Sequence, residues 1–293
     1  VTFTNGASTG PARSANTIAM PADVDDGAGN RRVAISGSMP LDSHPIVYAY
    51  AVPSARRFAE VALTQALTES GVSVAHSASG ALVDVKTFSA LYVAGNIIAT
   101  HTSPPLAQDV KVTLKVSDNL HAAMMPYLWG ALLAHDTTDP QAAGFRLEHG
   151  FLTQAGFDAS RFVQNDGEGA NAFFAPAQIV RFLAYVRGRP YYPYIYRGLP
   201  VMGVDGTLFN IQNHAAGAGK IHAKTGTNGT SDMLNSRFFL TGKGLVGYMT
   251  SRSGRHIAFC LYVNNFSAPA NQDLTRTAGQ ILGEMANDGY LDL

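Results

Sequence analysis

A four-residue motif near the end of the chain carries groups suited to acyl-transfer chemistry. Lys224, Thr225, Gly226 and Thr227 stand in a stretch that begins like a β-strand and ends like a turn. A lysine cation, two hydroxyls and nearby backbone N–H groups can bind a carboxylate and a developing oxyanion. Such chemistry also needs a nucleophile, which must come from outside this motif.

A second motif, Ser117-Asp118-Asn119, precedes the helical pattern "LHAAMMPYLWGALLAH", which continues through Pro126. Ser, Asp and Asn satisfy free N–H groups at helix starts, so the motif predicts the beginning of a helix. A serine and an asparagine at such a start can also be aimed rigidly into a cleft. Both interpretations hold together.

The composition indicates a globular chain with a large core. Its 293 residues are 46% hydrophobic and 14% charged, and 21 basic residues balance 21 acidic ones. This neutrality gives no basic footprint for nucleic acid, so no nucleic-acid partner is predicted. The longest apolar run, residues 90–99, is far shorter than the ~20 residues of a spanning helix, so no transmembrane segment is predicted.

Metal and cofactor sites are not predicted. Cys260 is the only cysteine, which excludes an intramolecular disulfide and a cysteine-based metal cluster, and its apolar neighbours predict a buried, inert thiol. The nine histidines show no spacing typical of zinc ligands.

Periodicity and turn residues predict an α+β chain. Residues 1–48 read as short strands and turns, including a strand in "RRVAISGSM", and a domain boundary is expected near residue 49. Helices are predicted from Ser54 to Gly71, over 175–188 and over about 271–287. Strands are predicted over 219–227, 236–250 and 256–264, as antiparallel neighbours on which the last helix packs.

Two further lysines stand among glycines. Lys220 in "GAGKI" and Lys243 in "TGKGL" resemble fragments of a phosphate-binding loop. The pattern fails because His214 occupies the first glycine position and Ile221 replaces the required Ser or Thr. Ordinary glycine turns are therefore expected at both lysines.

Four ordered blocks carry a family resemblance. Their order and spacing resemble the D-alanyl-D-alanine carboxypeptidase/endopeptidase family of low-molecular-mass penicillin-binding proteins, class C type, over about residues 30–293. The blocks are "HTSPPLAQDVKVTLKVSDNLHAAMM" (101–125), "GFDASRFVQNDGEGANAFFAPAQIVRFL" (156–183), "LPVMGVDGTL" (199–208) and "KIHAKTGT" (220–227).

The resemblance implies an α+β fold like that of serine β-lactamases, with an antiparallel sheet flanked by helices. Residues 1–48 would be the end of an inserted, β-rich accessory domain. Residues 49–293 would be the C-terminal part of the penicillin-binding domain.

The resemblance also implies roles for the two motifs. Ser117 would relay a proton to the leaving amine, Asn119 would hold the substrate's peptide carbonyl, and Lys224 would add positive potential near Ser117. Thr225 and Thr227, separated by Gly226, would receive the terminal carboxylate of D-alanine, and the N–H of Thr227 would form half of the oxyanion hole.

A third block, Asp166-Gly167-Glu168-Gly169, matches the family's Asp-Gly-Ser-Gly except that Glu168 replaces Ser. Asp166 and Gly167 are therefore expected to form a wall of the substrate cleft.

The family's nucleophile lies in Ser-x-x-Lys, where lysine takes the serine proton. No serine in this sequence has Lys three residues later. Because the chain opens at Val1 without Met or a signal peptide, we expect an N-terminal fragment or separate chain to supply the motif, and this chain alone to be inactive.

The expected function is a serine-type D-Ala-D-Ala carboxypeptidase or endopeptidase acting on peptidoglycan peptides. β-Lactam antibiotics would be its other ligands, its location would be periplasmic or otherwise extracytoplasmic, and no cofactor is implied. The alternatives are a non-catalytic peptidoglycan-binding module of the same fold, and a β-lactamase or esterase.

Overall fold

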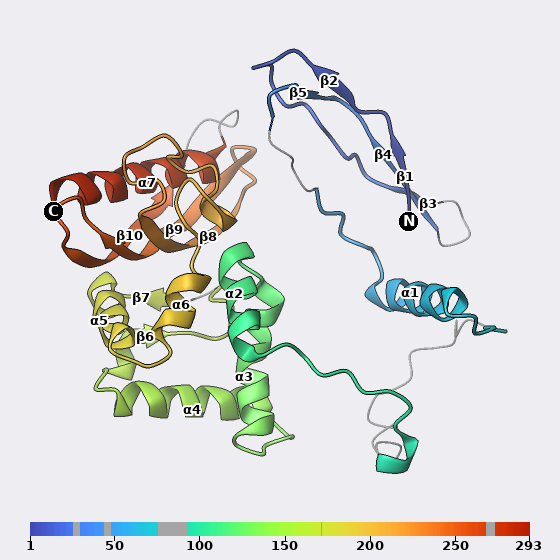
Figure 1. The fold of residues 1–293 in the computed structure, drawn as a ribbon, viewed down its shortest axis with the longest axis horizontal. Coiled ribbons are helices and arrows are strands. Elements are labelled where there is room, and N and C mark those ends of the chain that lie inside the picture. The colour runs from blue at the N-terminus through green and yellow to red at the C-terminus, as the bar shows by residue number, and fades with distance from the viewer. Residues whose placement is uncertain (26–29, 44–47, 76–92, 171, 268–272) are drawn as a thin grey trace. The chain divides into compact units, whose positions relative to one another are not determined.

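The computed structural model describes residues 1–25, 30–43, 48–75, 93–170, 172–267 and 273–293. The chain divides into two compact units, Val1–Thr100 and His101–Leu293, and each is described by itself (Figure 1). The expected assignment of residues 1–48 to an inserted domain and 49–293 to the penicillin-binding domain stays a prediction.

The first unit begins with short strands. β1 (Thr2–Asn5) pairs in parallel with β4 (Arg31–Ile35), and β3 (Val24–Asp25) pairs antiparallel with β4. β2 (Ser8–Gly10) pairs in parallel with β5 (Ser38–Pro40). The strand predicted in "RRVAISGSM" therefore forms as two strands, β4 and β5.

A helix follows where Ser54 and Gly71 predict one. α1 spans Ala55–Glu69, and the Ser54 hydroxyl accepts the Arg57 N–H at 3.2 Å. Gly71 lies just beyond the helix at φ +82°, a left-handed conformation that glycine adopts without strain. A short 3₁₀ turn, η2, follows at Ala94–Asn96.

The second unit contains the predicted antiparallel sheet, in the order β10–β9–β8. Its strands are β8 (Ile221–Asp232), β9 (Arg237–Thr250) and β10 (His256–Phe266). In the β8–β9 register Thr225 faces Leu245 and Thr227 faces Lys243. Cross-strand partners project to the same face, so these four side chains share one side of the sheet.

Helix α7 (Leu274–Asp292) packs on that side of the sheet. Its Leu282 joins a core with Ile221, Ala223, Leu245 and Met249, all almost fully buried. The predicted helix is confirmed, although it ends later than expected.

On the other side of the sheet lie α5 (Pro176–Arg187) and α6 (Tyr192–Gly198). The Tyr248 hydroxyl donates to the Leu183 carbonyl of α5 at 2.8 Å, and the Tyr192 ring meets the Tyr248 ring edge-on. The sheet is thus flanked by helices, as predicted, and α5 begins at Pro176 and ends before Gly188 as its sequence indicates.

Three more helices complete the second unit: α2 (Leu106–Val116), α3 (Asn119–Leu132) and α4 (Pro140–Gln154). α3 and α4 pack closely through two glycines. A Cβ on Gly130 would lie 1.7 Å from the Pro140 carbonyl oxygen, and one on Gly144 would lie 1.9 Å from that of Pro126. The helix predicted after Ser117 forms with Pro126 inside it.

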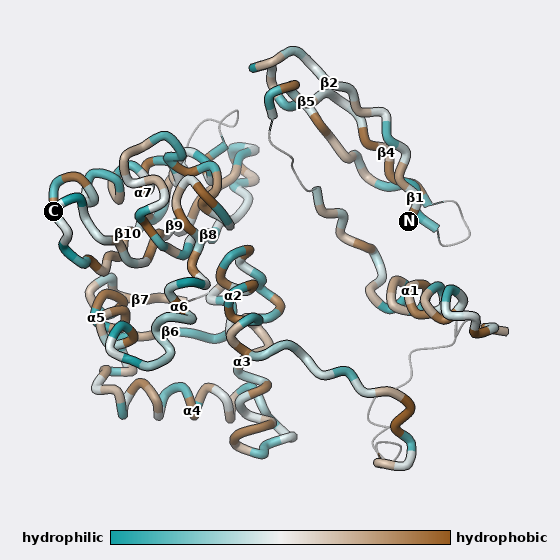
Figure 2. The backbone as a smooth tube through the Cα atoms, in the orientation of Figure 1, coloured by the Kyte–Doolittle hydropathy of each residue, from teal (hydrophilic) through white to brown (hydrophobic). Residues whose placement is uncertain are grey.

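The remaining elements are short. They are η3 (Ala159–Arg161), β6 (Phe162–Val163) paired with β7 (Phe173–Phe174), and η4 (Gly206–Leu208). Coloured by the hydropathy of each residue, the chain shows apolar residues on α2 and α3 as well as in the sheet (Figure 2). Among the described residues, none of the helices combines the length and apolar character needed to cross a membrane.

Candidate active site

Ser117 lies at the junction of two helices. It ends α2 in a left-handed conformation, φ 60° and ψ 55°, which is unfavourable for a residue with a Cβ. Asp118 follows as the N-cap of α3, where its Oδ1 accepts the His121 N–H at 3.0 Å. The predicted helix start is confirmed, and the helices on either side fix the backbone that carries Ser117.

Ser117 contacts Lys224 of β8 directly. Lys224 Nζ donates to Ser117 Oγ at 2.7 Å and to its neighbour's carbonyl, Thr225 O, at 2.6 Å. Because the Ser117 oxygen accepts this proton, its own O–H can be donated to another group. The structure thus brings the two motifs of the sequence together at the side chains on which their chemistry depends.

The potential at this contact is positive. Burial lowers the pKa of Lys224 to about 8, and the positive charge of Lys243 lowers it further. Among the described residues, neither lysine forms an ion pair with a carboxylate. An ammonium that is removed from water without a counterion favours binding of an anion nearby.

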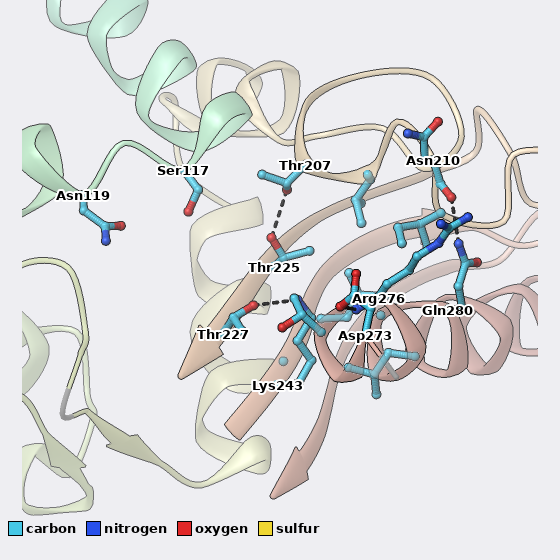
Figure 3. Close-up of a pocket in the computed structure, with 17 residues that line it drawn as sticks. Ser117, Asn119, Thr207, Asn210, Thr225, Thr227, Lys243, Asp273, Arg276 and Gln280 are labelled. Carbon is cyan, nitrogen blue, oxygen red and sulfur yellow. Dashed lines mark hydrogen bonds between the residues drawn. The ribbon is translucent and has the colours of Figure 1, made fainter. Parts of the chain in front are cut away.

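A cavity of about 620 Å³ lies beside β8 (Figure 3). Ser117, Asn119, Thr225 and Thr227 line it, so half of the eight predicted site residues face one space. Lys224 contacts the cavity residue Ser117 by a hydrogen bond. Gly226 is exposed and lies in β8 between Thr225 and Thr227. Further polar residues complete the lining: Thr207, Asn210, Lys243, Asp273, Thr275, Arg276 and Gln280.

The two threonines of β8 that line the cavity have hydrogen-bonded hydroxyls. Thr225 Oγ1 donates to Thr207 Oγ1 at 2.9 Å, and Thr227 Oγ1 accepts from Lys243 Nζ at 2.6 Å (Figure 3). These bonds hold the two side chains in place in the wall of the cavity.

An ion pair ties α2 to the loop that carries Thr207. Lys115 Nζ lies 2.7 and 2.6 Å from the two carboxylate oxygens of Asp205, whose Oδ1 also accepts the Val201 N–H at 2.8 Å. Burial alone would raise the pKa of Asp205, but the hydrogen bonds from Lys115 and Val201 outweigh it and the pKa is lowered. Each partner of this pair stands two residues before a cavity residue, Ser117 or Thr207.

Asp166 and Gly167 lie outside the residues that line this cavity. Asp166 Oδ1 accepts the N–H groups of Gly169 and Ala170 and so closes a tight turn. The side-chain amide of Asn228 in β8 donates to the Ala170 carbonyl, which joins this turn to the strand. Their place as a wall of the substrate cleft stays a prediction.

Two expectations conflicted at Lys243, a glycine turn and a strand over 236–250, and the structure confirms the strand. The turn expected at Lys220 is present, but "TGKGL" lies within β9, and Lys243 is a strand residue with 7% of its surface exposed. The flanking glycines pair with residues of β8, Gly242 with Asn228 and Gly244 with Gly226. Glycines that accommodate a close strand partner look like turn glycines in a sequence.

The sequence also left Thr207, Asp273 and Arg276 unassigned. Thr207 does lie in the quoted block 199–208, which was a signal that could have found it. Asp273 and Arg276 reach the cavity because α7 begins beside it, with Asp273 as its N-cap.

The fold is that of the penicillin-binding proteins. Over 99% of this chain, two crystal structures of penicillin-binding protein 4 (dacB) from Haemophilus influenzae superpose with TM-scores of 0.60 and 0.59 at 19% identity. One of them is complexed with a β-lactam, and the chain covers 60% and 63% of the two structures.

Residues 2–284 match the D-Ala-D-Ala carboxypeptidase 3 (S13) family, and the chain belongs to this family. It is 30% identical over 274 residues to a D-alanyl-D-alanine carboxypeptidase of Actinomadura sp. (strain R39), covering 91% of this chain and 46% of the relative. It is 28% identical to penicillin-sensitive carboxypeptidase A of Dictyostelium discoideum, covering 74% and 39%. The chain therefore spans about half the length of these relatives or less.

Proposed function

We propose that this chain supplies the substrate-binding and proton-relay part of a serine-type D-Ala-D-Ala carboxypeptidase or endopeptidase. The observation that carries the proposal is the contact between Lys224 Nζ and Ser117 Oγ at 2.7 Å, which joins two motifs far apart in the sequence. Family membership, and the relatives described as carboxypeptidases, support the same reaction.

The reaction proceeds through an acyl-enzyme. The lysine of the Ser-x-x-Lys segment takes the proton of the serine, the serine oxygen attacks the carbonyl carbon between the two D-alanines, an ester bond forms, and the C–N bond breaks. Ser117 donates its proton to the leaving amine and receives the proton held by that lysine in return. Water then attacks the ester and releases the shortened peptide.

The other residues of the predicted site orient the substrate. The Asn119 amide holds the peptide carbonyl, and Lys224, Thr225 and Thr227 hold the terminal carboxylate. The Thr227 N–H donates to the oxyanion. Asp166 and Gly167 shape a wall of the cleft. No metal or cofactor takes part in these steps.

The nucleophile comes from a Ser-x-x-Lys segment that this sequence does not contain. We propose that another stretch of polypeptide, in the same protein or in a separate chain, carries it and packs against α2 and α3. Large apolar side chains on these helices and just beyond α3 support this docking, because Leu106, Leu120, Leu132 and the C-cap residue Leu133 are each more than 60% exposed.

The proposed substrates are peptidoglycan peptides ending in D-Ala-D-Ala, and β-lactam antibiotics would acylate the same serine. This substrate class places the protein in the periplasm or another extracytoplasmic space.

Labelled penicillin followed by denaturing electrophoresis tests the proposal. We expect the intact protein to be labelled on the polypeptide that carries Ser-x-x-Lys, and to release D-alanine from an acylated D-Ala-D-Ala peptide. A label within residues 1–293 would overturn the proposed location of the nucleophile. Absence of both label and D-alanine release would overturn the catalytic role in favour of a binding module, and rapid turnover of a chromogenic cephalosporin would favour a β-lactamase.

A further inference from the structure

Lys243 is a buried cation in the wall of the cavity. It projects from β9 on the α7 side of the sheet, opposite Thr227, and 7% of its surface is exposed. Gly279 of α7 lies against it, since a Cβ on that glycine would be in van der Waals contact with Lys243 Cε at 3.8 Å. The side chain is therefore enclosed between the sheet and the first turns of α7.

The surroundings of Lys243 do not neutralise its charge. In the part of the chain that the structure describes, its ammonium forms one hydrogen bond, to Thr227 Oγ1 at 2.6 Å, and no ion pair. The carboxylate of Asp273 acts on it from a longer range and opposes the effect of burial on its pKa, which remains lowered. A buried ammonium with so little compensation is costly unless a ligand supplies negative charge.

The hydrogen bond from Lys243 also sets the direction of the Thr227 hydroxyl. Because the Thr227 oxygen accepts a proton from Lys243, its own proton is available to a group in the cavity. Thr227 is exposed and lines this cavity together with Thr225 and Lys243 itself (Figure 3). An anion placed against β8 thus meets the available proton of Thr227 and a cation on the same face of the sheet, beside the Thr225 hydroxyl, which donates to Thr207.

We propose that Lys243 is a specificity-determining residue that makes this site require a free carboxylate at the C-terminus of the peptide. It acts by its charge and by directing the Thr227 hydroxyl toward the carboxylate. The inference rests on the proposed function and deepens it, because that function assigns the carboxylate to Lys224, Thr225 and Thr227 and gives Lys243 no role.

The test compares two substrates on the intact protein: an N-acylated peptide ending in D-Ala-D-Ala, and the same peptide ending in D-alaninamide. The measured quantity is the ratio of their kcat/KM values. We expect Lys243→Met, which keeps the aliphatic stem, to lower this ratio about tenfold or more, since it removes a charge-assisted contact. The loss should appear mainly as a higher KM for the carboxylate peptide, with the amide peptide little affected.

Two variants serve as controls. Lys243→Arg keeps the positive charge and should restore much of the preference for the carboxylate. Lys220→Met removes an exposed lysine of the turn before β8 and should keep the wild-type ratio. An unchanged ratio in Lys243→Met would overturn the inference while leaving the proposed function intact.

A measurement on the wild type decides the matter if Lys243→Met fails to fold. The NMR signal of Lys243 ¹³Cε, assigned by through-bond correlation experiments, should change its chemical shift when the carboxylate peptide is added. Its chemical shift should stay the same when the amide peptide is added. Equal shifts with both peptides, or none with either, would overturn the inference. Failure to release D-alanine, in contrast, would contradict only the proposed function, because the NMR titration of Lys243 measures peptide binding and does not require turnover.

Discussion

Lys224 on β8 and Ser117 at the α2–α3 junction form a hydrogen bond of 2.7 Å, in which the lysine donates and the serine oxygen accepts. This direction leaves the serine proton for a third group, which is what a proton relay to a leaving amine requires. The relay depends on a backbone conformation at Ser117 that only a well-packed junction can hold.

Ser117→Ala removes the relay. Since general acid catalysis contributes about 10²–10⁴-fold, the rate of D-alanine release by the intact protein should decrease by a factor in that range. KM for the peptide should change little, because the alanine leaves the cavity and its carboxylate-binding groups in place. A variant with more than half of the wild-type kcat would contradict the relay.

Ser117→Gly separates chemistry from strain. The left-handed conformation costs a residue with a Cβ roughly 1–2 kcal/mol, and glycine adopts it freely. Ser117→Gly should therefore unfold at higher denaturant concentration than Ser117→Ala, by about 1 kcal/mol in the free energy of unfolding, although both lack the hydroxyl. Equal stabilities would show that the junction is unstrained.

The pKa of Lys224 predicts how carboxylate binding depends on pH. Burial lowers this pKa to about 8, with a contribution from Lys243, so the ammonium loses its proton as pH rises through 8. Binding of a carboxylate favours the charged lysine, so affinity should be highest below pH 8 and weaken above it. Titration calorimetry with an acylated D-Ala-D-Ala peptide from pH 6.5 to 9.5 measures this, and a flat profile would contradict it.

The same shift predicts the sign of a stability change. Between the folded pKa of about 8 and the ordinary value of 10.5, the unfolded chain binds more protons than the folded one. The free energy of unfolding should therefore gain a stabilising contribution as pH rises across this window. Lys224→Met should lack that contribution, so the difference in stability between wild type and variant should change with pH from 8 to 10.5.

Much of the second unit follows from sequence patterns, because its elements obey simple rules. Pro176 and Gly188 bound an amphipathic helix, Ser-Asp-Asn begins another, and short turns join three strands into an antiparallel sheet. The contact between Ser117 and Lys224 was expected only through the family resemblance, since no local rule places two such distant residues together.

The rest of the cavity depends on tertiary packing. At Lys243 the pattern of residues 236–250 predicts a strand, while the neighbouring glycines resemble turn residues; in the structure these glycines permit close pairing of β9 with β8. Arg276 lines the cavity only because α7 starts beside it. Neither relationship leaves a periodic signal in the sequence.

The turn at Asp166 and Gly167 provides a last test of the proposed cleft wall. A Cβ on Gly167 would lie 2.1 Å from the Ala122 carbonyl oxygen of α3 and 2.9 Å from Pro126 Cδ, so Gly167→Ala must push the turn away from the helix. The turn is bonded to β8 through Asn228 and Ala170, and the displacement should reach the strand.

We expect Gly167→Ala to lower the free energy of unfolding by about 1–3 kcal/mol, the usual cost of forcing extra volume into a packed site. It should also slow acylation of the intact protein by labelled penicillin. Gly150→Ala is the matched control, because that helical glycine of α4 has no heavy atom within 4 Å of an added Cβ and should gain about 0.5–1 kcal/mol. If Gly167→Ala loses stability yet acylates at the wild-type rate, the turn supports the fold without shaping the cleft.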